Sequence, residues 1–320
     1  MTSEQILLVG NPAAGRGEAG AVFERVSAEM TRRSIDFDSA LPASPEAAWQ
    51  LLRSGAERGD RLVVVGGDGM VHLAANACAN TSGSLGIIGA GTGNDFAGAL
   101  GLPSLAAGRN VPKAVDAALG VSAPVDLLHV ASTAAVREAL DSSDGLTADS
   151  RFATSVATFG FSAVVNERAE RMRFPRGPSR YTVATLLEAA RLRSTMIELE
   201  LDDRRVTCEA TLVALANTAR FGGGMRIAPE ADPHDGLVDV VVIGAVGRAT
   251  LLRVLPKAFS GRHIEHPAVT VHRAARVRVI TSEPMAVRAD GEPVTVTPAT
   301  FTVAPAALAV AGVVAGFTDS

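Results

Sequence analysis

Short apolar runs alternate with longer amphipathic segments over about the first 120 residues. The runs at 6–9, 62–65 and 85–88 have the length of buried strands, whereas 18–33 and 45–58 carry apolar residues at helical spacing. Ser44 and Pro45 supply an N-cap and a favourable first residue for the second helix. The alternation predicts βαβ units and a parallel α/β sheet.

From residue 125 onward the pattern changes to runs with a period of two. These runs predict strands at 125–130, 197–201, 206–215, 238–243, 268–272 and 277–280, interrupted by helices at 181–192 and 248–259. We therefore expect a second, mainly β domain. The stretch 131–150 is rich in Ser, Thr, Ala and Asp without apolar periodicity, which predicts a mobile insertion.

Composition and charge exclude several classes of protein. The 320 residues are 47% hydrophobic and 20% charged with a net charge of -4, which is typical of a globular protein and not of a disordered chain or a polycationic nucleic-acid binder. The longest nearly unbroken apolar run, 303–317, is too short for a membrane span and contains Pro305.

The cysteines and the N-terminus indicate a compartment. Cys78 and Cys208 lie far apart without histidine pairs nearby, so neither a disulfide framework nor a zinc site is expected. The chain begins without a basic stretch or a cleavage site of the kind that export signals carry. We expect a cytoplasmic protein.

A glycine-bearing segment follows each of the three predicted strands of the first domain, at 11–17, 66–69 and 89–95. Ligands of open α/β sheets bind at such strand ends, and glycine lets backbone N–H groups approach a phosphate closely. No segment matches the P-loop, and Phe96 breaks a G-x-G-x-x-G pattern. One such loop can be a tight turn, but three, two of them containing an aspartate, predict a polyphosphate ligand.

Two acidic tripeptides are candidates for chemistry. Asp68 stands between glycines at a strand end, where a carboxylate can bind Mg²⁺ or accept a proton from a hydroxyl, although Gly-Asp-Gly can also be only a turn. Asp290-Gly291-Glu292 lies between predicted strands at 285–288 and 294–296, and from the residues alone a hairpin turn is preferred.

Six segments, in order from about residue 5 to about residue 310, resemble the diacylglycerol kinase catalytic family, and bacterial lipid kinases within it most closely. They are Asn11-Pro12-x-x-Gly15, Gly66-Gly67-Asp68-Gly69, Gly91-Thr92-Gly93-Asn94-Asp95-Phe96-Ala97, Gly222-Gly223-Gly224-Met225-x-Ile227-Ala228-Pro229, Asp235-Gly236-Leu237-Val238-Asp239-Val240 and Asp290-Gly291-Glu292. Gly-Gly-Asp-Gly alone also occurs in NAD kinases and phosphofructokinases, but six motifs in order make chance agreement implausible.

The resemblance implies two domains with ATP in the cleft between them. The first, over 1–124 with 303–320 returning to it, would be an α/β domain like that of NAD kinases and phosphofructokinases, and the second, over 125–302, a β-sandwich. The implied reaction transfers the γ-phosphoryl of ATP to a lipid hydroxyl, with diacylglycerol giving phosphatidic acid as the first expectation.

The resemblance also assigns residues. Glu292, with Asp290 beside it, would be the proton acceptor, and Asp68 would be catalytic; the choice between Asp290 and Glu292 stays open. Mg²⁺ would be held in a structural loop by the Asp235 carboxylate and the backbone carbonyls of Asp232 and Leu237. The ATP site would include Asn11, Pro12, Ala13, Ala14, Gly15, Gly66, Gly67, Asp68, Gly69, Met70, Val71, His72, Gly91, Thr92, Gly93, Asn94 and Asp95.

The chain departs from the family pattern after Gly69. Met70, Val71, His72 and Leu73 stand where the family usually has Thr, one variable residue and Asn-Glu. This departure weakens a relationship to NAD kinases, which rely on the Asn-Glu pair.

We expect ATP and a membrane lipid as partners, with no nucleic acid, and leave a homodimer open. Peripheral contact with the inner membrane face could use Arg168, Arg171, Arg173, Arg176 and Arg180, although such a run can also be a solvated helix end. Two other functions stay open: a kinase for a soluble acceptor such as NAD, and a nucleotide- or lipid-binding protein without catalysis.

Overall fold

A parallel sheet organises the N-terminal part of the computed structural model, which describes residues 5–11, 18–103, 105, 110–133, 150–172, 183–184, 187–188 and 193–313. Its strands lie in the order β2 (Asp38–Ala40), β1 (Ile6–Gly10), β3 (Arg61–Gly66), β4 (Ser84–Gly89) and β17 (Ala299–Ala311), and every neighbouring pair is parallel. The predicted α/β class of this part is confirmed.

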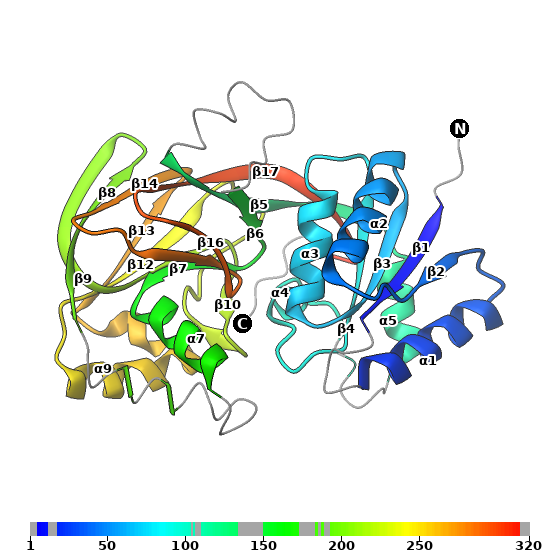
Figure 1. The fold of residues 1–320 in the computed structure, drawn as a ribbon, viewed down its shortest axis with the longest axis horizontal. Helices are drawn as coiled ribbons and strands as arrows, with labels where there is room; N and C mark the ends of the chain where they lie inside the picture. Colours follow the sequence, from blue (N-terminus) through cyan, green and yellow to red (C-terminus); the bar gives the residue numbers. More distant parts are fainter. Residues whose placement is uncertain are drawn as a thin grey trace.

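Helices cover both faces of this sheet (Figure 1). They are α1 (Glu18–Arg32), α2 (Pro45–Arg58), α3 (Asp68–Cys78), the short α4 (Asp95–Ala99) and α5 (Val111–Ala118). Successive strand side chains point to opposite faces, so Val64 packs in a core with α2 and α3 while Val63 and Val65 pack in another with α1 and α5. Strands buried on both faces explain the continuous apolar runs.

The second part is antiparallel and encloses its own core. Its strands are β5 (Ser122–Ser132), β6 (Ser150–Ala153), β7 (Val156–Gly160), β8 (Thr195–Leu201), β9 (Arg204–Ala216), β12 (Val238–Gly244), β13 (Val269–Ala274), β14 (Arg276–Thr281), β15 (Ala286–Ala289) and β16 (Glu292–Val296). Phe159, Leu199, Val240, Val277 and Phe301 belong to the core that they enclose. The predicted β-rich second domain is confirmed.

Helices α7 (Phe161–Arg171) and α9 (Arg248–Val254) pack on an outer face of this β domain, in a second core that includes Val165, Leu212 and Leu251. The helix predicted at 248–259 remains an α-helix only to 254 and continues as the 3-10 helix η3 (Leu255–Ser260), followed by η4 (Arg262–Glu265). Pro256 accounts for the change, because proline cannot donate the hydrogen bond that a continuous α-helix needs. The helix predicted at 181–192 and residues 134–149 of the predicted insertion fall largely or wholly outside the described residues.

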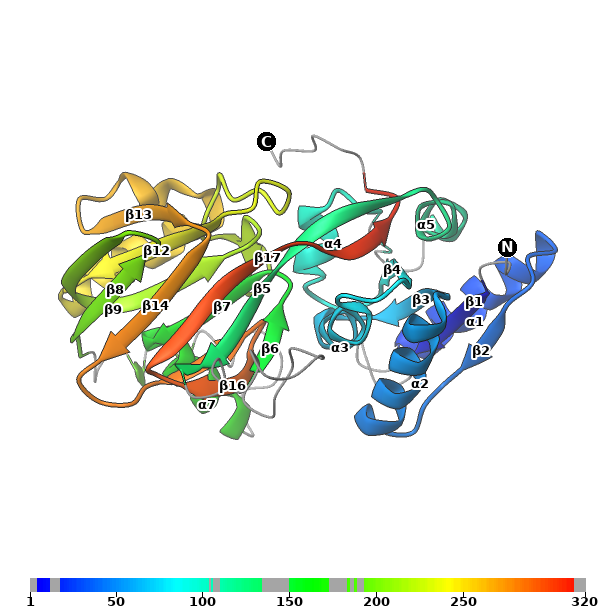
Figure 2. The same ribbon diagram turned by 90° about the horizontal axis from the view of Figure 1, so that it is seen from above.

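Strands β5 and β17 run side by side through both parts (Figure 2). Their antiparallel register shifts between Ala304 and Leu308, where the buried Asp126 carboxylate accepts a hydrogen bond from the Ala306 amide at 2.7 Å. Beyond this irregularity β17 pairs with β4 at Ala309 and Val310. Among the described helices, none is both long and apolar enough to cross a bilayer.

Candidate active site

Two glycine loops pack backbone against backbone at the carboxyl ends of β3 and β4. The Ala90 amide donates to the Gly66 carbonyl at 2.8 Å, and a Cβ on Gly91 would lie 2.5 Å from the Cα of Gly67. No side chain can be accommodated at that approach. The Asn11 amide at the end of β1 donates to the Val65 carbonyl at 3.3 Å, whereas Pro12, Ala13, Ala14 and Gly15 lie outside the described residues.

Asn94 closes the second loop with its side chain. Its Oδ1 accepts from the Gly91 amide at 2.9 Å, and its Nδ2 donates to the Gly91 carbonyl at 3.0 Å. Thr92 and Gly93 stay exposed at the tip of the loop, as does Gly69 in the first turn of α3. These predicted ATP-site residues are therefore open to a ligand.

Asp68, the first residue of α3, joins the two loops through its carboxylate. The two oxygens accept from the Asn94 amide at 2.9 Å and the Asp95 amide at 2.7 Å, where α4 begins. Burial, and next the charge of Asp95, raise the pKa of Asp68 above its ordinary value against the effect of these hydrogen bonds. The charge of Asp290 adds to the rise, so the two predicted catalytic aspartates share one electrostatic environment.

Asp95 connects the first domain to the second. Its carboxylate accepts from the Gly223 amide and the Gly224 amide, each at 2.8 Å, in the turn between β10 (Arg220–Phe221) and β11 (Met225–Arg226). Both glycines have positive φ, 84° and 96°, which residues with a Cβ rarely adopt. Glycine here lets two consecutive amides point at one carboxylate.

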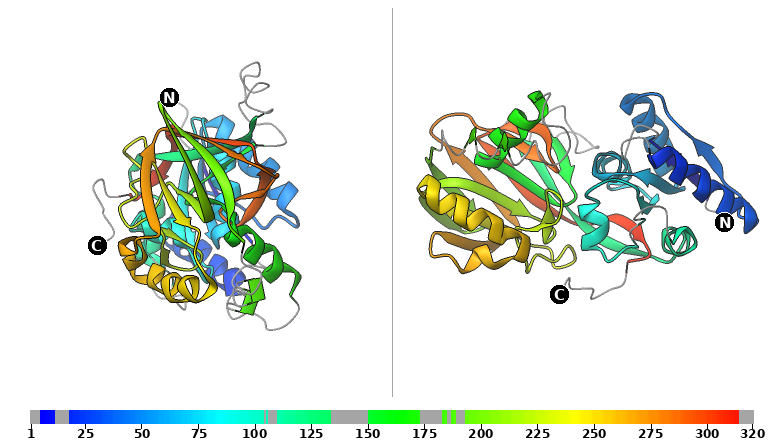
Figure 3. Two further views of the ribbon diagram at one scale, coloured as in Figure 1. Left: turned by 90° about the vertical axis from the view of Figure 1, so that its left-hand side faces the viewer. Right: turned by 90° about the horizontal axis from the view of Figure 1, so that it is seen from below.

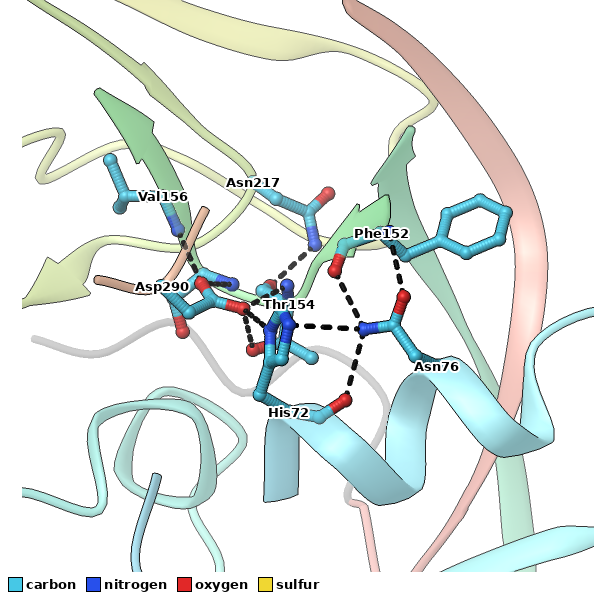
Figure 4. Close-up of polar contacts among 8 residues, drawn as sticks. His72, Asn76, Phe152, Thr154, Val156, Asn217 and Asp290 are labelled. Atoms are coloured by element: carbon cyan, nitrogen blue, oxygen red, sulfur yellow. Dashed lines mark hydrogen bonds and ion pairs between the residues drawn. The ribbon is translucent and has the colours of Figure 1, made fainter. Parts of the chain in front are cut away.

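Asp290 is the centre of a buried hydrogen-bond network (Figure 4). Its side chain is 6% exposed, and Oδ2 accepts from His72 Nδ1 at 2.9 Å and from Thr154 through both its amide, at 2.7 Å, and its hydroxyl, at 2.8 Å. Oδ1 accepts from the amides of Ser155 at 2.8 Å and Val156 at 3.1 Å. Burial alone would raise the pKa of Asp290, but these hydrogen bonds outweigh it and hold the pKa below its ordinary value.

Helix α3 reaches this network with two polar residues one turn apart. His72 bonds Asp290, and Asn76 forms a reciprocal pair with Phe152, accepting its amide at 2.8 Å and donating to its carbonyl at 2.9 Å. The side chains of Met70 and Val71 pack in the apolar core. Contact of Met70, Val71 and His72 with ATP stays a prediction, and burial leaves little of their side chains for it.

Glu292 stands two residues beyond this network at the start of β16. Asp290 and Gly291 form the tight turn before it, with φ of 51° and 91°, which is typical of a type I′ hairpin. The hairpin expected from the residues alone is thus present, and it carries one buried and one exposed acidic residue. Within the described part of the chain, the Glu292 carboxylate forms no hydrogen bond or ion pair.

Two family models cover nearly the whole chain. Residues 5–130 match the diacylglycerol kinase catalytic domain, and residues 155–312 match the YegS C-terminal NAD kinase beta sandwich-like domain. A diacylglycerol kinase of Mycobacterium tuberculosis is 35% identical over 303 residues, which cover 94% of this chain and 92% of that one. The chain belongs to the diacylglycerol kinase catalytic family. The predicted resemblance is confirmed, and the protein is a phosphotransferase with an alcohol acceptor.

Other relatives agree with this family assignment. A diacylglycerol kinase of Bacillus subtilis is 25% identical over 294 residues, covering 89% of this chain and 88% of that one. The crystal structure of a diacylglycerol kinase from Bacillus anthracis str. Sterne shares the fold, with a TM-score of 0.69 and 18% identity, covering 98% of this chain and all of that one. A kinase family implies ATP as co-substrate and a divalent metal ion.

The predicted magnesium loop of this family member has oxygen donors held in turns. The Asp235 carboxylate accepts from the Leu237 amide at 2.9 Å, and Asp232 accepts from the His234 amide at 3.1 Å. Asp235 also pairs with Arg273, whose Nε lies 3.5 Å from a buried oxygen of Asp239. This oxygen has no hydrogen-bond partner among the described residues. Burial raises the pKa of Asp239 to about 6. Oxygen donors of this kind are the ligands that Mg²⁺ prefers, but Arg273 occupies the Asp235 carboxylate here. The magnesium site stays a prediction.

Two of the arginines predicted to contact the membrane form ion pairs in the structure. Arg168 pairs with Glu188, and Arg171 with Glu167 at 2.5 Å. Arg173, Arg176 and Arg180 lie outside the described residues.

Several residues that build the site carried no motif. Asn76, Asp126 and Thr154 each form a hydrogen bond with a segment far away in the sequence. The available signal was the four-residue spacing of His72 and Asn76 in an otherwise apolar helix, because polar groups on a buried face need partners elsewhere.

Proposed function

We propose that the protein transfers the γ-phosphoryl group of ATP to the hydroxyl of diacylglycerol, giving phosphatidic acid and ADP. The observation that carries the proposal is the set of hydrogen bonds that connects the two domains. Asp68, Asp95 and Asp290 join the glycine loops to the β domain and leave Glu292 exposed beside them. Exposed loop amides suit a phosphate chain, and a free carboxylate suits an attacking hydroxyl.

In the proposed step Glu292 accepts the proton of the lipid hydroxyl while the hydroxyl oxygen attacks the γ-phosphorus. The bond from the γ-phosphorus to the bridging oxygen breaks, and ADP leaves with the electron pair. Asp290 is a poor base because five hydrogen bonds occupy its oxygens. We assign it the role of fixing the turn that carries Glu292.

The nucleotide would lie on the glycine loops. The exposed Gly69, Thr92 and Gly93 would contact phosphates, with Asn11, Gly66, Gly67 and Gly91 shaping the loops beneath them. Asn94 and Asp95 hold the second loop in place. Asp68 fixes both loops, and its carboxylate would offer negative charge to the metal ion that accompanies ATP.

Asp232, Asp235 and Leu237 would hold a structural Mg²⁺. When bound, such an ion adds charge neutralisation and stabilises the loop that it occupies. The Asp126 carboxylate accepts the Gly236 amide at 2.8 Å, so this loop is anchored to β5 near the crossing between the domains.

The test is an assay with radiolabelled ATP and purified protein. Dispersed diacylglycerol, sphingosine, ceramide, phosphatidylglycerol and NAD are offered in parallel. Labelled phosphatidic acid is the expected product. Phosphorylation of NAD and not of diacylglycerol would overturn the proposal in favour of a soluble acceptor, and ATP binding without any labelled product would favour a binding protein.

A further inference from the structure

Helix α9 and η3 form an amphipathic element on the outside of the β domain. Leu251, Val254 and Ala258 are buried at three- and four-residue spacing, so one side of the element packs on the sheet. Five of its exposed residues are charged or large and apolar, and we call them the α9–η3 surface: Arg248, Leu252, Arg253, Lys257 and Phe259.

The cations of this surface have no acidic partners in the described part of the chain. Residues 240–264 contain no Asp or Glu in a protein whose net charge is -4. Among the described residues, Arg248, Arg253 and Lys257 form no ion pair, in contrast to Arg168 and Arg171 of α7. Three unpaired cations within ten residues attract an anionic surface.

The apolar members of the surface are also unusual. Phe259 is 59% exposed and Leu252 is 39% exposed. In the part of the chain that the structure describes, Phe259 is the one phenylalanine classed as exposed. Exposed aromatic and leucine side chains between cations are typical of elements that lie in the interfacial region of a bilayer.

The segment directly after η3 packs against the residues that follow the glycine turn of the candidate active site. Gly261, directly after η3, is so close to Pro229 that a Cβ there would meet its side chain at 2.7 Å. The His263 Nε2 lies 2.9 Å from the Ile227 carbonyl, just beyond β11. The turn before β11 is the one held by Asp95. Figures 1 and 3 both place α9 at the same edge of the β domain as α7.

We propose that the α9–η3 surface docks the protein on anionic phospholipid bilayers. Its cations would meet headgroup phosphates, and Phe259 and Leu252 would enter the interface beside them. The surface is the exposed side of a helical element that carries both charge and apolar groups, which favours a bilayer over an acidic protein. The inference rests on the proposed function, because a diacylglycerol acceptor resides in a bilayer.

Vesicle sedimentation tests the proposal without ATP. Wild type is mixed with vesicles of phosphatidylcholine alone or with phosphatidylglycerol added, at low and high salt. We expect binding to the anionic vesicles, weakened by salt. The double variant Arg253→Glu/Lys257→Glu should bind at least roughly tenfold more weakly, since each cation near an anionic leaflet adds to the binding. Phe259→Ser should bind roughly fivefold more weakly, as expected for the loss of one apolar side chain at the interface.

Matched controls distinguish an effect of this surface on vesicle binding from an effect of net charge or of general hydrophobicity. Arg204→Glu/Lys113→Glu changes the charge equally at exposed positions elsewhere, and Val121→Ser removes an 88% exposed apolar residue. These controls should bind within about twofold of wild type, as surface substitutions away from a site usually have small effects. Equal losses in controls and test variants, or no binding of wild type to anionic vesicles, would overturn the proposal and favour an acidic protein as occupant.

Activity distinguishes this proposal from the proposed function. The test variants should phosphorylate short-chain diacylglycerol in non-ionic detergent like wild type, and lose activity only on diacylglycerol in anionic vesicles. Wild-type protein that is inactive on every lipid would contradict the proposed function. Vesicle sedimentation would still test whether the α9–η3 surface binds the bilayer. Equal activity of the test variants on vesicles would count against docking through α9 and η3.

Discussion

Asp290 Oδ2 accepts a hydrogen bond from His72 Nδ1 at 2.9 Å, and this contact joins the first turns of α3 to the β15–β16 hairpin across 218 residues of sequence. His72 occupies the position at which the family usually has Asn. The contact couples the helix after the first glycine-aspartate loop to the turn that presents Glu292.

Removal of the Asp290 carboxylate should destabilise the fold. In Asp290→Ala, His72, Thr154 and two further amides lose a buried acceptor, and we expect the free energy of unfolding to fall by about 3 to 5 kcal/mol. Urea denaturation measures it. His72→Ala, which removes one donor, should lower the free energy of unfolding by less, and His72→Asn should lower it less still. A change below about 0.5 kcal/mol in Asp290→Ala, the range of ordinary surface substitutions, would contradict the role of the network.

The stability conferred by Asp290 should be lost in acid. Because the pKa of Asp290 is lower in the folded than in the unfolded state, its contribution is complete above its ordinary value and disappears as pH falls through the folded pKa. Asp290→Asn, like a protonated carboxyl, places hydrogen toward the N–H donors. The difference in unfolding free energy between wild type and this variant should shrink from about pH 7 to about pH 3. A difference independent of pH would refute the assignment.

Local signals predicted local structure well. Helix α2 spans Pro45–Arg58 as expected, with the Ser44 side chain accepting the Ala47 amide at 3.2 Å. The predicted strands of the first domain each continue into the glycine that follows them, and β3 and β4 also begin one residue earlier than predicted. An N-cap residue, a proline in the first turn and the spacing of apolar residues act within a few residues. They therefore determine a helix without a tertiary partner.

Contacts between distant segments could not be derived from those signals. Position 72 was identified only as part of a phosphate loop, whereas its side chain bonds a turn near the other end of the chain. The same holds for Asp95, whose carboxylate binds the glycines at 223 and 224. Family motifs predicted that these segments belong to the site. Only the folded structure shows that the Asp290 carboxylate is hydrogen-bonded and that Glu292 is exposed.

The two cysteines should differ in reactivity. Burial raises the pKa of the Cys78 thiol to about 12, whereas Cys208 is half-buried. At about pH 8 a thiol reagent should label Cys208 in the folded protein and Cys78 only on unfolding, because the thiolate is the reactive form. Mass spectrometry after timed labelling measures both, with Cys208→Ser as control. Equal rates in the native protein would contradict the burial of Cys78.

Magnesium should compete with Arg273 for Asp235. An ion that binds only the folded state raises the melting temperature by mass action, so Mg²⁺ should stabilise wild type and should stabilise Arg273→Ala more strongly. Asp235→Ala should not respond, whereas Asp203→Ala, which changes an exposed acid elsewhere, should respond like wild type. Thermal unfolding across a magnesium titration checks this. Identical responses in all four proteins would remove the ion from this loop.

Substitution of Glu292 should lower turnover, whereas substitution of Asp290 should mainly lower stability. If Glu292 accepts the proton of the lipid hydroxyl, Glu292→Gln keeps the size of the side chain but removes the base, and kcat should fall by roughly 10² to 10⁴. The affinity for ATP and the unfolding free energy should barely change, because this side chain is exposed and has no partner among the described residues.

Asp290→Asn should show the opposite balance, with a clear loss of stability and a smaller loss of kcat, since its carboxylate is fully hydrogen-bonded. Steady-state kinetics with diacylglycerol in detergent, ATP binding by calorimetry and urea denaturation are measured on both variants. Near-normal turnover in Glu292→Gln would leave it an ordinary hairpin residue. If instead Asp290→Asn lost turnover while keeping its stability, the base would have to be Asp290, and the hydrogen bonds that occupy its oxygens would have to open during each catalytic cycle.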